Sequence, residues 1–345
     1  MKTKSIFFSA AAISAAAFSA SFAFAAVPGP VSGGSIDFAS AFPNATFEQA
    51  YPQCSANPVN GELEVMPPTA GANCNIRPDE QIIAIYSIKL CRNKPSAPSL
   101  AAMSDLSSCQ AIFDSTNNAG SEVSIKLGET TALTNGTVRV PDAGTYTHLY
   151  VELNPEVKIK TSAKFDKIMA STNGTSSGLY CWSKQANTYN FANNYQGSLP
   201  DATVCGNEAA TSVDPTSVFF NSLSDDSRSP GGTGFVTTMT NIPTSEGGRS
   251  TLDAFLIGTD SKLVALQTIN TMGDVKRLVG IITLPNGGVT VNAATTGLVI
   301  GYNNTLGSQL STQTLEVGES ASRISKFGNG PFDATVTTVP PEEQR

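Results

Sequence analysis

The segment from Gln81 to Cys91 places an apolar side chain at every second position. A period of two puts alternate side chains on one face of an extended chain, so this segment predicts a half-buried β-strand. Gly144–Leu153 follows a turn at Pro141–Gly144 and predicts a second strand of the same kind. The side chains expected to share one face are those of Ile82, Ala84, Tyr86, Ile88 and Leu90 in the first strand, and of Leu149, Val151 and Leu153 in the second.

Many further short runs of β-branched and aromatic residues are separated by residues that favour turns. This pattern is typical of β-sandwiches. We therefore predict an all-β fold, an antiparallel β-sandwich of immunoglobulin-like or jelly-roll-like type. The further strands are expected at 123–127, 137–140, 156–160, 179–182, 217–220, 235–239, 252–258, 263–268, 278–284, 289–291, 298–302 and 334–339.

Helical patterns are scarce in this sequence. Single helical turns are expected around Ala97–Leu106 and Phe165–Ala170, and neither segment sustains a period of 3.6 residues. Folds with a parallel sheet need helices of ten or more residues between their strands. We therefore do not expect an α/β enzyme fold.

The first 25 residues have the pattern of a secretory signal peptide. Lys2 and Lys4 precede an apolar stretch, Ile6–Phe22, and Ala23-Phe24-Ala25 forms a small-residue cleavage signal. We expect cleavage before Ala26, which leaves 26–345 as the exported chain. The alanine-rich signal suggests a bacterial source, with secretion to the cell surface or the exterior and the periplasm as an alternative. No later stretch is apolar enough for a membrane helix, so membrane insertion is not expected.

The chain has six cysteines, an even number that suits three disulfides in an oxidising compartment. The sequential pairing is favoured because each pair would close a polar loop. Zinc is a poor alternative, since the sequence has one histidine and no Cys-x-x-Cys pair. The expected pairs are Cys54–Cys74, Cys91–Cys109 and Cys181–Cys205.

The cysteines also suggest a division of the chain. A disulfide-stabilised N-terminal β domain is expected at 26–205, a linker or boundary loop at 206–233, and a cysteine-free β domain at 234–345. The alternative is a single sandwich in which late strands pair with early ones.

Charge argues against two classes of partner. The formal net charge is −7 and only 14% of residues are charged. Nucleic acids and anionic membranes are bound by clustered Lys and Arg, and the sequence has no such cluster. We expect no nucleic-acid partner.

Three residues of the second strand form a candidate interface. Tyr146, His148 and Tyr150 alternate along one side of it. Aromatic side chains on a sheet can stack on sugars or contact a partner protein, and more often they pack within their own chain. His148 is the one histidine, and no acid at a fixed spacing is available to orient it as a base.

Catalytic patterns are weak. Gly174-Thr175-Ser176-Ser177-Gly178 has the spacing of a hydrolase nucleophile turn, but it precedes a predicted strand and lacks a downstream histidine. The carboxylate pairs Glu62/Glu64 and Asp225/Asp226 have simpler structural interpretations, although a glycosidase pair stays open. We expect no cofactor, no metal site and no enzymatic activity.

Two functional hypotheses follow. The first is a secreted, non-enzymatic structural or cell-surface protein, such as a subunit of a filament or surface layer, that associates with itself or with other surface proteins through strand edges. The extended segments 27–35 and 336–345 could add a strand to a neighbour. The second is a carbohydrate-binding or glycan-processing protein that uses the aromatic residues.

Overall fold

The computed structural model describes eleven segments of the chain: 6–9, 52–60, 62–68, 73–127, 129–184, 203–219, 236–243, 249–264, 275–313, 322–330 and 333–339. They form β-strands joined by turns and loops, with one short 3₁₀ turn at Pro285–Gly287. The predicted all-β fold is confirmed. The sandwich type stays a prediction. No helix in the described segments is long and apolar enough to cross a membrane.

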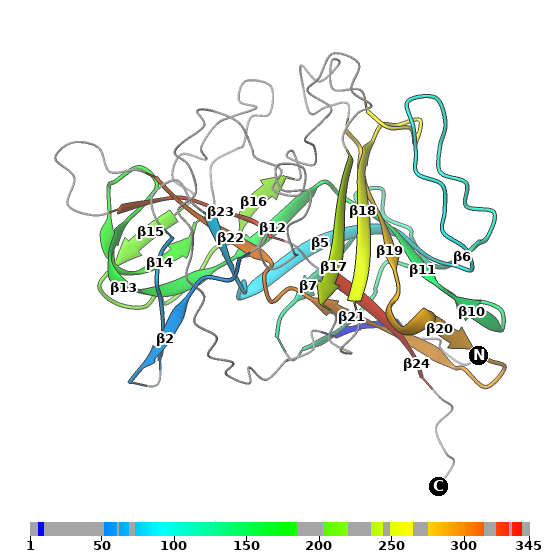
Figure 1. Cartoon of the computed structure of the whole chain (residues 1–345), viewed down its shortest axis with the longest axis horizontal. Helices are drawn as coiled ribbons and strands as arrows, with labels where there is room; N and C mark the ends of the chain where they lie inside the picture. The colour runs from blue at the N-terminus through cyan, green and yellow to red at the C-terminus, as the bar shows by residue number, and fades with distance from the viewer. Residues whose placement is uncertain are drawn as a thin grey trace, which may run out of the picture.

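The largest sheet has ten strands (Figure 1). Its main path runs β16-β12-β5-β11-β19-β18-β17, while β6 and β7 pair with β5, and β9 pairs with β6. The bounds are β16 Thr216–Phe219, β12 Glu156–Lys160, β5 Glu80–Cys91, β11 His148–Leu153, β19 Arg277–Thr283, β18 Arg249–Ile257, β17 Val236–Pro243, β6 Cys109–Ser115, β7 Ser121–Ile125 and β9 Gly136–Val138.

An eight-stranded sheet has the order β15-β14-β13-β23-β22-β4, with the β2–β3 hairpin attached to β13. The bounds are β15 Thr203–Gly206, β14 Ser177–Ser183, β13 Ser162–Ala170, β23 Ser322–Asn329, β22 Ser308–Gln313, β4 Asn73–Ile76, β2 Ala56–Val59 and β3 Glu62–Val65.

Two smaller sheets complete the fold. Four strands have the order β24-β21-β1-β8, and β10 pairs with β20. The bounds are β24 Asp333–Val339, β21 Gly297–Asn303, β1 Ile6–Ser9, β8 Thr130–Ala132, β10 Gly144–Tyr146 and β20 Val289–Val291.

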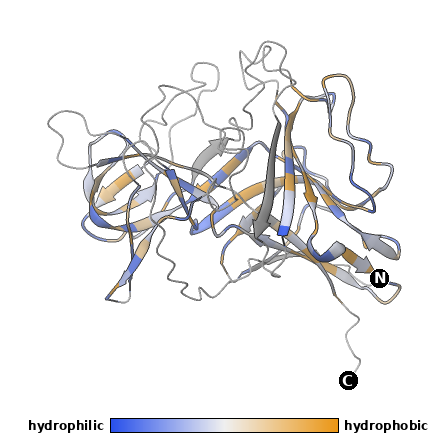
Figure 2. Ribbon diagram, in the orientation of Figure 1, coloured by the Kyte–Doolittle hydropathy of each residue, from blue (hydrophilic) through white to orange (hydrophobic). Residues whose placement is uncertain are grey.

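The main core lies between the ten-stranded and four-stranded sheets. Residues such as Ile85 and Leu149 from the larger sheet cluster with Leu298 and Ile300 from β21. Figure 2 shows hydrophobic residues along β5 and β19 at the centre of the larger sheet. A second core lies in the eight-stranded sheet and includes Phe165 and Phe327.

The three predicted disulfides are present with the sequential pairing: Cys54–Cys74, Cys91–Cys109 and Cys181–Cys205. They do not mark off an N-terminal part. Four of these cysteines share a core with Leu310, Ile324 and Phe327 from the last third of the chain. Three disulfides indicate an oxidising extracellular or periplasmic compartment.

Strands from both sides of the predicted boundary pair with each other. β11 pairs with β19, and β4 pairs with β22. β16 lies inside the segment predicted as a linker, at 206–233. The two-domain division therefore stays a prediction. Two domains with this boundary would share hydrogen-bonded sheets, because strands from both sides of it pair with each other.

The residues predicted to share one face of β5 differ in burial. Ile88 and Leu90 are buried, whereas in the first half of the strand the alternate residues Ile83 and Ile85 are buried and their neighbours are half-buried. The pairing with β11 shifts register here, because Glu152 pairs with Ser87 and the next residue, Leu153, pairs with Ile85. A β-bulge of this kind exchanges the two faces of a strand.

Both predicted helical turns are wrong. Phe165–Ala170 belongs to β13, where β14, β3 and β23 supply its backbone partners. Ala97–Leu106 is an irregular loop without helical residues. In the first case tertiary pairing overrides a weak local preference.

Phe327 offers a test of the second core. It is fully buried beside Phe165 in the same cluster, so Phe327→Ala should lower the free energy of unfolding by about 3–5 kcal/mol. The control Leu63→Ala, at a residue that is 61% exposed, should change it by less than about 0.5 kcal/mol. Urea unfolding of both variants checks this, and equal losses would contradict the assigned packing.

Candidate functional site

The predicted interface residues lie on both sides of a break between two strands. Tyr146 ends β10 and His148 begins β11, with Thr147 between them. Tyr146 is buried in the main core. Tyr150 is buried in a third cluster together with Phe255 and Ile281. The three side chains therefore do not form one aromatic surface, and neither tyrosine ring is exposed.

The hydroxyl group of Tyr146 fixes the turn before β10. It donates a hydrogen bond to the carbonyl oxygen of Asp142 at 2.8 Å, and Oε1 of Gln110 lies 3.2 Å away as a second, weaker acceptor for the same proton. The guanidinium carbon of Arg92 lies 5.5 Å from the ring centroid. A hydrogen bond from a buried tyrosine hydroxyl to the backbone a few residues upstream restrains the intervening turn. This residue holds a turn in place.

A loop closed by the Cys91–Cys109 disulfide covers Tyr150. The two cysteines join β5 to β6, and Cys91 and Leu106 pack in the same cluster as Tyr150. The loop is also attached to neighbouring elements, because Lys94 forms an ion pair of 2.7 Å with Asp253 and the N–H of Leu263 donates to the carbonyl oxygen of Ser99. The loop therefore covers a face of the ten-stranded sheet.

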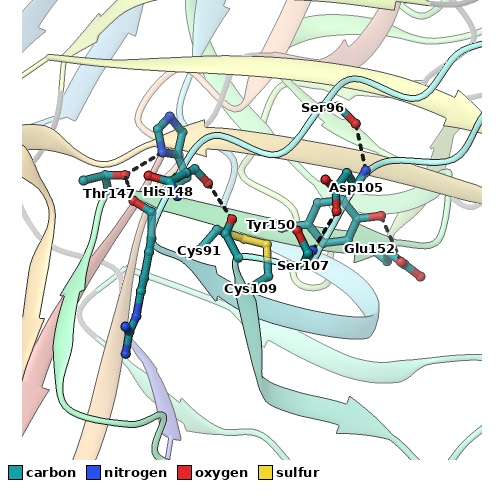
Figure 3. Close-up of a disulfide and its surroundings, with 12 residues drawn as sticks. Cys91, Ser96, Asp105, Ser107, Cys109, Thr147, His148, Tyr150 and Glu152 are labelled. Atoms are coloured by element: carbon teal, nitrogen blue, oxygen red, sulfur yellow. Dashed lines mark hydrogen bonds between the residues drawn. A yellow bond between two sulfur atoms is a disulfide. The ribbon is translucent and has the colours of Figure 1, made fainter.

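Tyr150 is chemically inert in this position. Its hydroxyl donates to Oε1 of Glu152 at 3.0 Å. Figure 3 shows the ring beside the disulfide with its hydroxyl group directed towards Glu152. Burial, reinforced by the negative charge of Glu152, raises the pKa of the Tyr150 phenol well above its usual value. The phenol thus stays protonated at physiological pH.

His148 is half-buried beside this loop. Its Nδ1 lies 2.8 Å from Oγ1 of Thr147, which in turn donates to the carbonyl oxygen of Arg92 (Figure 3). Burial lowers the pKa of the imidazole, the positive charge of Lys94 lowers it further, and Asp253 acts in the opposite direction. The neutral imidazole is therefore favoured.

The candidate catalytic groups in the described segments have structural partners. Oγ of Ser176 accepts a hydrogen bond from the N–H of Cys205 in the turn between β13 and β14. Glu62 and Glu64 both form ion pairs with Lys164, at 2.7 and 3.0 Å. The hydrogen bond from Lys164 lowers the pKa of Glu62, so this carboxyl group stays ionised and is unsuited to be a general acid.

Asp225 and Asp226 lie outside the described residues. Within the described segments, no group of three or more His, Cys, Asp or Glu side chains is placed to hold a metal ion.

The second candidate site is a position inside the four-stranded sheet. Ile6–Ser9, as β1, pairs in parallel with Leu298–Gly301 of β21 and antiparallel with Thr130–Ala132 of β8. We call this position the β1 slot. The slot is interior to the sheet, since it has a hydrogen-bonded strand on each side.

The wall of the slot on β21 belongs to the main core. Leu298 and Ile300 are buried in it, and they stand in register with Ile6 and Phe8. Val299 and Gly301 alternate with them and are partly exposed. The slot therefore has one apolar side directed to the core and one side nearer to solvent.

Comparison with protein-family models, with curated proteins and with solved structures finds no match. Sequence reasoning missed the β1 slot because Ile6–Ser9 lies in the predicted signal peptide, which was excluded from the fold. The signal that could have found it is the Ile-x-Phe alternation of Ile6 and Phe8 within an otherwise small-residue leader.

Tyr146→Phe tests the hydrogen bond between the Tyr146 hydroxyl and the carbonyl oxygen of Asp142. Removal of the hydroxyl leaves the Asp142 carbonyl oxygen without this donor, so the free energy of unfolding should fall by about 1–2 kcal/mol. Tyr180→Phe is the matched control, because its hydroxyl contacts Glu62 at an exposed site and its loss should cost less than about 0.5 kcal/mol. Thermal or urea unfolding measures both, and an unchanged Tyr146→Phe protein would contradict the assigned role.

His148 predicts how stability depends on pH. Its pKa is lowered in the folded chain, whereas an unfolded histidine titrates near about pH 6.5. As the pH falls below that value, the unfolded chain binds a proton that the folded chain resists, so stability decreases. His148→Gln should therefore lose less stability than the unsubstituted chain between pH 7.5 and 5.5 in urea unfolding. An equal loss in both proteins would show that His148 is not the titrating group.

Proposed function

We propose that this chain is an exported, non-enzymatic structural protein of the cell exterior, a subunit of a filament or surface layer that assembles by β-strand addition. One observation carries the proposal: the strand inside the β1 slot consists of residues that the sequence marks for removal during export. Cleavage before Ala26 would take this strand away from the folded protein.

The loss of β1 would leave a position that another strand fits. Neighbouring strands lie about 4.8 Å apart, so removing one leaves β21 and β8 about 9–10 Å apart. Backbone groups of four residues on β21 and three on β8 would lose their paired residues. Unpaired strand edges bind further strands, which is a common route to association between proteins.

The apolar side of the slot adds to this driving force. Leu298 and Ile300 are fully buried while β1 is present. Loss of this neighbouring strand would bring apolar surface at the edge of β21 into contact with water, at a cost of about 25 cal/mol for each Å² exposed. A strand with apolar residues at alternate positions would restore both the hydrogen bonds and the burial.

Two further features support an exported structural protein. Three disulfides suit an oxidising exterior or periplasmic compartment. The main core between the ten-stranded and four-stranded sheets supports the finer proposal of an immunoglobulin-like sandwich. Glycan binding through Tyr146 and Tyr150 has less support, since both rings are buried.

The proposal is tested on the protein purified after export, with cleavage before residue 26 checked by mass spectrometry. We expect the exported chain to form ordered polymers, seen by light scattering and negative-stain microscopy. A synthetic peptide with the sequence of residues 3–10 should occupy the slot and keep the chain monomeric. The same peptide with Phe8→Asp should leave polymerisation unchanged, because it would place a carboxylate at the position paired with the buried residue Ile300. An exported chain that stays monomeric at all concentrations would contradict the proposed function.

A further inference from the structure

We infer that the chain binds a neutral saccharide on the face of the eight-stranded sheet that Tyr180 and Trp182 share. β14 carries both residues, and β13 and β15 pair with it on either side (Figure 1). We use the name β14 platform for these two residues together with Glu62, Glu64 and Lys164. The platform and the β1 slot belong to different sheets, so the inference goes beyond the proposed function and does not depend on assembly.

Two aromatic side chains project from one face of β14. Tyr180 and Trp182 lie two positions apart on this strand, and both are half-buried. Cys181 lies between them and is buried in the second core, on the opposite face. The Cys181–Cys205 disulfide joins β14 to β15 there. A covalent bond therefore fixes the strand pair beneath the two rings, so little ordering is needed when a ligand binds.

The ring of Trp182 extends over Gly206 of β15. A Cβ atom at position 206 would lie 3.2 Å from Cη2 of this ring. The glycine thus leaves room for the six-membered part of the indole to pack against the neighbouring strand. The face of an aromatic ring carries partial negative charge, and the apolar C–H groups of a sugar ring pack against such a face. Trp182 is accordingly the stacking residue of the platform.

Charged groups beside the rings supply hydrogen bonds for sugar hydroxyl groups. Lys164 pairs with Tyr180 across the strands, and its Nζ lies 5.7 Å from the centre of the Tyr180 ring. This Nζ also forms ion pairs of 2.7 Å with Oε2 of Glu62 and 3.0 Å with Glu64. The Tyr180 hydroxyl donates to the same Oε2 of Glu62 at 3.1 Å. The Glu62 side chain is 53% exposed, so its Oε1 can accept a hydrogen bond from a bound sugar.

The charges of the platform select a neutral ligand. Its two carboxylates and one ammonium group leave one net negative charge, and the whole chain has a formal charge of −7. A carboxylated or sulfated saccharide would be repelled, whereas the hydroxyl groups of a neutral sugar both donate and accept. A protein partner fits less well, because the centre of a protein interface is depleted of charged residues.

Fluorescence gives a direct test, because Trp182 is the one tryptophan of the chain. The purified exported chain is titrated with three neutral oligosaccharides, cellohexaose, chitohexaose and maltohexaose, and with acidic oligogalacturonate. We expect a saturable change in emission with at least one neutral oligosaccharide, and at least tenfold weaker binding of oligogalacturonate. The absence of a saturable change with all three neutral oligosaccharides would overturn the inference, as would equal or tighter binding of oligogalacturonate.

Variants locate the binding site on the platform. Isothermal titration calorimetry with the neutral oligosaccharide that binds should show at least tenfold weaker binding for Trp182→Ala and at least threefold weaker binding for Glu62→Ala. The Glu62 ion pair is exposed, so its loss should leave the thermal unfolding midpoint nearly unchanged. The control is Leu63→Ala, because Leu63 is 61% exposed and alternates with Glu62 and Glu64 on β3. It should bind as the unsubstituted chain does, and equal affinity in all three variants would overturn the inference.

The same emission distinguishes a saccharide from a second copy of the chain as the occupant. Without sugar, the emission of Trp182 should be equal below and above the concentration at which the chain assembles, because the β1 slot lies in another sheet. A blue shift on assembly without any response to saccharides would make the platform a contact between copies and overturn the inference. A chain that binds the saccharide and never assembles would contradict the proposed function alone.

Discussion

An interior strand must find hydrogen-bond partners on both of its edges, and β21 meets this requirement with β24 on one side and β1 on the other. The main core depends on the same arrangement, because Leu298 and Ile300 of β21 pack against strands of the ten-stranded sheet. β1, however, comes from residues with the pattern of an export signal. A strand that the sheet needs is thus made from a segment that the proposed export would remove, and the proposed assembly follows from this conflict.

The ten-stranded sheet is held together by strand pairings that do not involve β1. β5 pairs with β6, β7, β11 and β12, so one strand connects elements from widely separated parts of the sequence. The Cys91–Cys109 disulfide joins β5 to β6 and closes the loop over Tyr150. These contacts are independent of β1, which leaves the slot as a local feature of an otherwise connected structure.

The sequence predicted the strands well where period-two alternation was strong. β12 and β20 have the predicted bounds, and β5, β19 and β21 begin and end within one residue of theirs. Prediction from the sequence failed where contacts between distant parts of the chain determine the structure. Examples are the bulge that exchanges the faces of β5 and the parallel pairing with β3 that places Phe165 in a strand. Strands such as β4, β22 and β23 were missed because polar residues interrupt their apolar patterns.

The candidate sites could likewise be predicted only where local sequence determines them. The sequential disulfides followed from loop composition and compartment, whereas the separation of Tyr146 from Tyr150 depends on a strand break at Thr147. The cover over Tyr150 depends on where the 92–108 loop folds, and the slot depends on which strands lie beside residues 6–9. None of these is encoded in local spacing.

Hydrogen exchange of the β8 amides tests the central claim most directly. In the described part of the chain, Thr130–Ala132 pair with β1 and with no other strand, so their exchange reports whether the slot is filled. The account predicts fast exchange of these amides in dilute exported monomers and strong protection above the assembly concentration, while β11 stays protected in both. Equal protection of β8 at every concentration would mean that export does not open a slot for a second copy, and it would contradict the account.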